Sequence, residues 1–157
     1  MSAKLLFTLI CDDVRVENTR KLVLVGVYNY TITFPAPVGL PPSQPNSPPK
    51  FALPKLCLVR RWRVDTPEFT AQTSILDPNN TVAISFETKL TKPSDDTFCQ
   101  EVVQLAGPVL FPGQYSIVTT VSGAEQEGNR ELFEVRLAPE TAVAHLLSGT
   151  TRDTVQT

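Results

Sequence analysis

The chain has few of the residues that usually carry chemistry. Its 157 residues include one histidine, one tryptophan, one methionine and three cysteines. The cysteines, Cys11, Cys57 and Cys99, are odd in number and far apart, and no Cys-x-x-Cys pair occurs. Such a set is typical of reduced thiols, so we expect a cytoplasmic protein. A zinc site needs three or four ligands at a characteristic spacing, which the sequence lacks, so it predicts no metal and no cofactor.

Long apolar runs and an excess of basic charge are also lacking. No apolar run approaches the ~18 residues that span a bilayer. The run at residues 5–11 leads into Asp12 and Asp13 without a cleavage site, which favours a strand over a signal peptide. The formal net charge is −2, whereas nucleic-acid-binding domains usually carry a basic face. We therefore expect neither a membrane nor a nucleic acid as a partner.

The two-residue alternation of β-strands, in contrast, runs through most of the chain. In the first run, Leu5, Phe7, Leu9 and Cys11 share one face. Later strands are predicted at residues 55–64, 69–76, 81–90, 98–105, 109–111, 115–121 and 133–137. The turn signals between them lie at the spacing of a sandwich. The sequence predicts an all-β fold, a two-sheet antiparallel β-sandwich of about eight strands in one domain over residues 1–138.

Residues 21–34 predict one long strand. One face stays apolar throughout, while the other changes from valine to polar residues at about residue 28. This change is expected where a strand leaves a doubly covered region for a half-exposed one. Gly26 precedes the change, where a β-bulge or a close backbone approach is expected.

Two segments break the strand pattern. Eight of the 14 prolines fall within residues 35–54. Because proline lacks the N–H that a strand ladder needs, a long surface loop without a strand is predicted there, inserted after the second strand. Residues 139–157 form a separate tail, in which apolar residues recur at helical spacing and predict a short C-terminal helix.

No catalytic set emerges. His145, in the predicted helix, is the only histidine, and nothing pairs it with a nucleophile, so we expect a non-enzymatic protein and assign no catalytic residue. The carboxylate pairs Asp12–Asp13 and Asp95–Asp96 raise the alternative of a calcium site between end loops. Without an Asp-x-Asp-x-Asp loop, we interpret these aspartates as turn residues.

Residues 60–63, Arg-Arg-Trp-Arg, form the densest cluster of charge. Strand alternation places Arg61 and Arg63 on one face and Arg60 with Trp62 on the other. One interpretation is a site for an anion or another small ligand. The favoured one is cross-strand pairing with glutamates, with Trp62 in the core.

The proline loop is the best candidate for an interaction surface, because it contains Pro-x-x-Pro spacings that aromatic grooves can bind. We predict a protein-interaction or assembly module that binds a protein partner or self-associates. The alternatives are a small-ligand or anion-binding β-sandwich using residues 60–63, and a cryptic hydrolase. The candidate partner surface comprises Tyr28, Tyr30, Pro41, Pro42, Pro45, Pro48, Pro49, Arg61 and Arg63.

Several segments resemble a family of small bacterial and phage β-sandwich proteins that has no established activity. They are LICDDVR at residues 9–15, KLVLVGVY at 21–28, LPKL at 53–56, RW at 61–62, PGQY at 112–115 and VSG at 121–123. The resemblance extends to about residue 138. It implies a β-sandwich fold and a bacterial or phage origin, and no chemistry.

Overall fold

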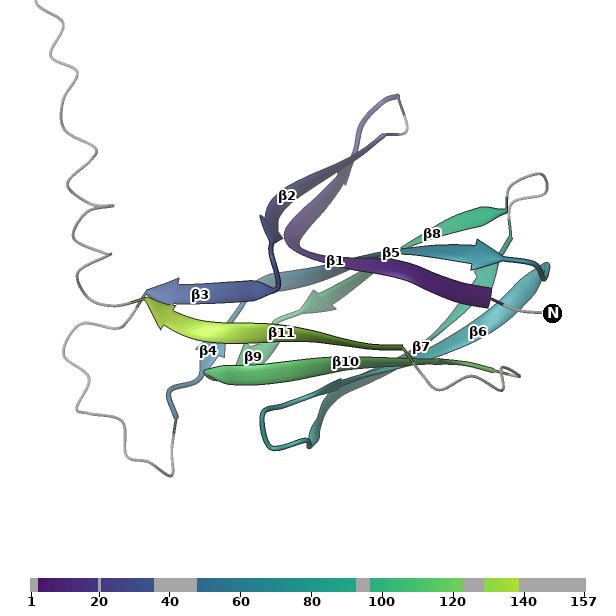
Figure 1. Ribbon diagram of the computed structural model, residues 1–157. Helices are drawn as coiled ribbons and strands as arrows, with labels where there is room; N and C mark the ends of the chain where they lie inside the picture. The colour runs from purple at the N-terminus through teal and green to yellow at the C-terminus, as the bar shows by residue number, and fades with distance from the viewer. Residues whose placement is uncertain (1–2, 20, 36–47, 93–96, 123–128, 139–157) are drawn as a thin grey trace, which may run out of the picture.

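The computed structural model describes residues 3–19, 21–35, 48–92, 97–122 and 129–138. Every regular element in these ranges is a β-strand, so the all-β prediction is confirmed (Figure 1). The strands are β1 (Ala3–Val16), β2 (Leu22–Tyr28), β3 (Thr31–Pro35), β4 (Phe51–Ala52), β5 (Lys55–Val64), β6 (Glu68–Leu76), β7 (Val82–Thr91), β8 (Phe98–Ala106), β9 (Val109–Leu110), β10 (Gly113–Val121) and β11 (Asn129–Ala138). Within the described ranges no helix is long and apolar enough to cross a membrane.

These strands form two large sheets and one small one. The four-stranded sheet has the order β2-β1-β5-β8, and the five-stranded sheet has the order β3-β11-β10-β6-β7. The third sheet pairs β4 with β9. Buried side chains from both large sheets, among them Leu58 of β5 and Tyr115 of β10, pack into one core cluster. The core therefore lies between the two large sheets.

The segment at residues 21–34 is two strands rather than one. β2 pairs with β1, whereas β3 joins the other large sheet and pairs in parallel with β11. The chain changes sheets at Tyr30, whose φ of 59° is left-handed and whose carbonyl accepts the Glu134 N–H at 2.8 Å. The two-residue alternation of side chains continues across this turn, so the sequence pattern gave no sign of the turn. The parallel pair also corrects the prediction of a purely antiparallel fold.

The first strand differs from its prediction in two ways. β1 continues to Val16, so Asp12 and Asp13 are strand residues and the turn predicted for them is wrong. The ladder to β5 shifts between Leu5 and Phe7. Because a bulge reverses the facing of the residues that follow it, Leu5 is buried while Phe7 is exposed, and the single face predicted for the run does not form.

The proline-rich segment is not free of strands. Pro35 ends β3, and Phe51 and Ala52 form β4, between Pro49 and Pro54. Both β4 residues have backbone N–H groups, and Phe51 stacks on Phe34 with ring centroids 4.6 Å apart. Pairing with β9 holds this short strand in place. Residues 36–47, the carboxylates at 95–96 and the predicted helix with His145 lie outside the described residues.

A buried polar layer divides the core. On the inward face of β5, Leu56 and Leu58 belong to one apolar cluster, and Trp62 and Val64 belong to another. Arg60 lies between them and is fully buried. Each neighbouring strand contributes one buried polar side chain at this level: Thr8 from β1, Thr73 from β6, Glu101 from β8 and Thr119 from β10.

Hydrogen bonds connect this layer across both sheets. Arg60 donates from Nη2 to Glu101 Oε1 and from Nη1 to Thr73 Oγ1, each at 2.5 Å. Trp62 Nε1 donates to Glu101 Oε2 at 2.9 Å. The cross-strand pairing with glutamates predicted for residues 60–63 is confirmed for Arg60, and the core position predicted for Trp62 is confirmed. Burying the Arg60 charge costs desolvation free energy, which the facing Glu101 carboxylate offsets.

Removing one member of the Arg60–Glu101 ion pair tests its contribution to stability. Glu101→Leu is expected to lower the free energy of unfolding by about 3–5 kcal/mol, because Arg60 keeps a buried charge and loses its counter-ion. Urea denaturation measures the change. The double variant Arg60→Leu/Glu101→Leu should lose less than Glu101→Leu alone, and an equal or greater loss in the double variant would contradict the assignment.

Candidate functional site

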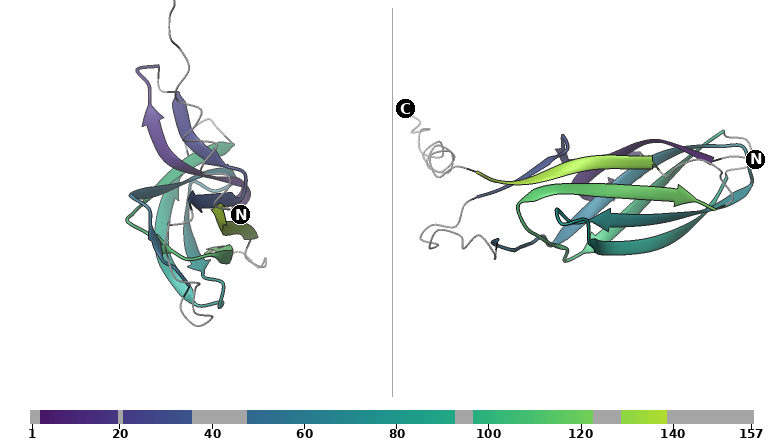
Figure 2. Two further views of the ribbon diagram at one scale, coloured as in Figure 1. Left: turned by 90° about the vertical axis from the view of Figure 1, so that its left-hand side faces the viewer. Right: turned by 60° about the horizontal axis from the view of Figure 1, so that its bottom comes forward.

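The part of the β1–β2 hairpin beyond Cys11 projects away from β5, the next strand of its sheet (Figures 1 and 2). At its root the chain bends at Gly26, whose φ is +62°, a left-handed value that favours glycine. A Cβ at this position would overlap the Asp12 carboxylate. Tyr28 donates its hydroxyl hydrogen to Asp12 Oδ1, and burial together with this bond raises the Tyr28 pKa. Asp12, Gly26 and Tyr28 thus fix how the hairpin leaves the sheet.

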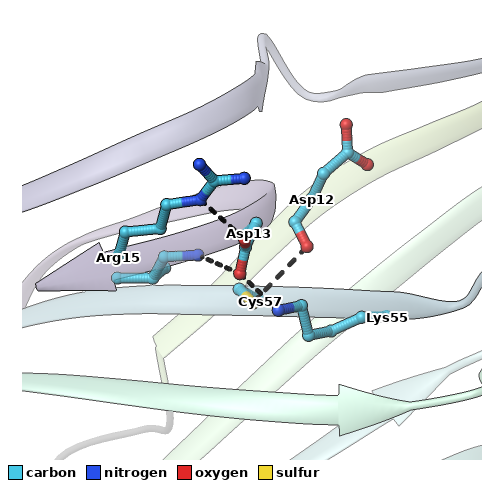
Figure 3. Close-up of polar contacts among 6 residues, drawn as sticks. Asp12, Asp13, Arg15, Lys55 and Cys57 are labelled. Atoms are coloured by element: carbon cyan, nitrogen blue, oxygen red, sulfur yellow. Dashed lines mark hydrogen bonds and ion pairs between the residues drawn. The ribbon is translucent and has the colours of Figure 1, made fainter.

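Asp13 ties the hairpin to β5. Its carboxylate lies between Lys55 Nζ, with which it forms an ion pair, and Arg15 Nε, 3.3 Å away (Figure 3). Hydrogen bonds from Lys55 and then Arg15 hold the Asp13 pKa below its usual range. The Asp12 carboxylate points away from this group in Figure 3. The two adjacent carboxylates therefore have separate partners.

Two thiols lie beneath the hairpin. Cys11 of β1 and Cys57 of β5 face each other in the ladder, and both are fully buried. Cys57 Sγ donates to the Asp12 carbonyl oxygen at 3.7 Å. Val14 and Leu24 of the hairpin pack against the cluster that these cysteines form with Val59. Burial is the main reason that the Cys11 pKa rises to about 11.

The root is built for attachment rather than for acid–base chemistry. Asp12 accepts from Tyr28 and Asp13 is paired with two cations, so both carboxylates are engaged. Across the described ranges, no group of three His, Cys, Asp or Glu side chains is placed to hold a metal ion. The Asp12 and Asp13 contacts hold the hairpin in position, and the two cysteine thiols are enclosed beneath it.

The hairpin itself carries exposed apolar side chains. Val16, Val23, Val25 and Val27 are all exposed, with Val25 at 38%. β2 forms one end of its sheet, so among the described strands only β1 pairs with it. An open edge with exposed valines is a site at which another strand can add.

The predicted partner residues do not come together as one surface. Tyr28 is half-buried at the hairpin root, whereas Tyr30 is 52% exposed in the turn between sheets. Pro48 is exposed and Pro49 half-buried, while Pro41, Pro42 and Pro45 lie outside the described residues. Arg61 and Arg63 are exposed, as the alternation predicts, and Arg61 lies 5.0 Å from the Phe98 ring centroid.

Sequence reasoning missed the hairpin root. Asp12 and Asp13 were interpreted as turn residues, and Cys11 and Cys57 were considered only as separate reduced thiols. Gly26 is the exception, because the close approach expected at this glycine is present: the Asp12 carboxylate lies against it. The cysteine pairing had no local signal, because 45 residues separate the two positions.

Comparisons with known proteins add no family to this description. A scan of protein-family models found no match, and neither did a search of curated proteins.

Two glycines offer a matched test of the bend. Gly26→Ala should destabilise the protein by more than the roughly 1–2 kcal/mol of a left-handed backbone, because the new methyl group also displaces Asp12. Gly107 has nearly the same φ, +61°, and nothing lies within 4 Å of its Cβ position. Gly107→Ala should lose the backbone contribution alone in chemical denaturation. Equal losses would show that the Asp12 contact is unimportant.

The Asp13 pair predicts a specific pH dependence. Because the folded pKa of Asp13 lies below its ordinary 3.8, its stabilisation is present above about pH 4 and lost as the pH falls through the folded value. Asp13→Asn should therefore be less stable than wild type at neutral pH. The two free energies of unfolding should converge in acid. A difference that is constant from neutral to acid pH would exclude the ion pair as its cause.

Proposed function

We propose that the protein is a two-sheet β-sandwich that serves as a non-enzymatic assembly module, and that a second copy of this chain pairs along β2. The observation that carries the proposal is the open, uncharged edge of β2, on which Val23, Val25 and Val27 are exposed. Backbone N–H and C=O groups on such an edge supply affinity, and alternate side chains supply specificity.

The other edges of the large sheets are less suited to pairing. β3 has only five residues and ends at Pro35, which cannot donate to a ladder. β7 exposes Glu87 and Lys89, and charges on an edge strand oppose edge-to-edge association. β8 exposes glutamines on either side of Val102. The composition of β2, Leu-Val-Leu-Val-Gly-Val-Tyr, is the most apolar of the four edges.

Self-pairing also satisfies the symmetry of a dimer. If two β2 strands run antiparallel about Leu24, Val23 of each copy faces Val25 of the other. Pairs of β-branched side chains stabilise neighbouring strands when they lie directly opposite each other. The edge is therefore complementary to itself, which favours a second copy over an unrelated strand as the occupant.

The test is the oligomeric state of the full chain, measured by size-exclusion chromatography with light scattering across a concentration series. Wild type should dimerise, and Val25→Lys should be monomeric because each new lysine would face Val23 of the other copy and replace both valine pairs beside the centre of the ladder. Val102→Lys on β8 is the matched control, since Val102 is 37% exposed and Val25 is 38% exposed. It should dimerise like wild type.

Two results would overturn the proposal. One is a wild-type protein that is monomeric at every concentration. The other is a dimer that Val102→Lys disrupts and Val25→Lys leaves intact, which would assign the interface to β8.

A deletion confined to residues 36–47 examines the proline loop separately, because it preserves β3 and β4 and also retains Leu53 of the core.

A further inference from the structure

Cys11 and Cys57 have the geometry that a disulfide needs. They are directly opposite in an antiparallel ladder and form the last described pair between β1 and β5. Opposed residues in such a ladder have Cα atoms roughly 4.5–5.5 Å apart. A disulfide joins Cα atoms roughly 4.4–6.8 Å apart. Both cysteines also belong to one buried cluster, which they form with Val59.

The same structure limits access to the pair. Both thiols are fully buried, and the hairpin side chains Val14 and Leu24 pack against them. Burial also raises the pKa of each thiol, which keeps both protonated and unreactive. The Asp13–Lys55 ion pair holds the hairpin on β5 beside Cys57. An oxidant can reach the sulfurs only when the hairpin moves.

We infer that Cys11 and Cys57 form a cross-strand disulfide whose rate of formation is set by the opening of the β1–β2 hairpin. The oxidant is a low-molecular-weight disulfide. One cysteine thiolate attacks it and releases one small thiol, and the second cysteine thiolate displaces the other. The protein loses two protons and two electrons in forming the S–S bond, and the electrons reduce the oxidant to two thiols.

The modification changes the hairpin root as well as the thiols. The Cys57 S–H group that donates to the Asp12 carbonyl is lost, and β1 becomes covalently joined to β5 where the hairpin departs. The inference concerns the thiols alone and does not depend on association through β2.

Oxidised glutathione is the probe, and the full chain carrying Cys99→Ala is the background, so that only the two cysteines in question remain. Intact mass should fall by two hydrogen atoms, and peptide mapping should join Cys11 to Cys57. Cys57→Ser should abolish the loss. If the folded protein keeps both thiols under conditions that oxidise the unfolded chain, or forms only intermolecular disulfides, the inference is wrong.

The rate of disulfide formation tests whether opening of the β1–β2 hairpin controls the reaction. Lys55→Met removes the ion pair and should speed disulfide formation by about two- to fivefold, the range expected for a partly exposed pair. Lys89→Met removes the exposed Lys89–Glu68 pair in the other large sheet and is the matched control. It should leave the rate unchanged. Equal rates in all three proteins would remove the hairpin from the mechanism and leave the disulfide to be judged by its mass.

Discussion

The buried pair between Arg60 and Glu101 is the contact on which the arrangement of the two sheets depends. A guanidinium between two apolar clusters is costly unless its charge and its N–H groups are matched. Glu101 of β8 supplies the charge, and Thr73 of β6 supplies an acceptor from the opposite sheet. A slip of β5 by one residue would turn Arg60 outward and bury Arg61 without a partner. The polar layer thus penalises a one-residue slip of β5.

That fixed framework sets the position of the hairpin. β1 is paired with β5 from Ala3 to Cys11, and beyond Cys11 it pairs with β2 alone. The bend at Gly26, the Asp12–Tyr28 bond and the Asp13–Lys55 pair all occur within this short transition. One consequence is an arm with an open valine-rich edge. The other is a dithiol enclosed beneath the arm. The open β2 edge and the enclosed dithiol therefore both arise where β1 leaves β5.

The sequence predicted individual strands well where one face meets the core. β5 was predicted at residues 55–64 and forms over Lys55–Val64, because no bulge interrupts its alternation, and Cys57 and Val59 on its second face are buried as well. Prediction failed where the alternation survives a change of partner. Residues 28–34 keep their parity through the turn at Tyr30, so two strands in different sheets looked like one. The prediction for residues 5–11 failed for the opposite reason. The partner strand stays the same there, but the bulge after Leu5 inserts one residue and reverses the facing of the side chains that follow.

By itself the sequence determined the all-β class, the buried position of Trp62 and the outward position of Arg61 and Arg63, because these follow from a period of two along a single strand. Tertiary structure alone decided which strands are neighbours. That choice pairs Arg60 with Glu101, Cys11 with Cys57 and Asp13 with Lys55, residues that are 41, 46 and 42 positions apart. No local pattern encodes contacts at such separations, because they depend on the strand order that the whole chain adopts when its core closes.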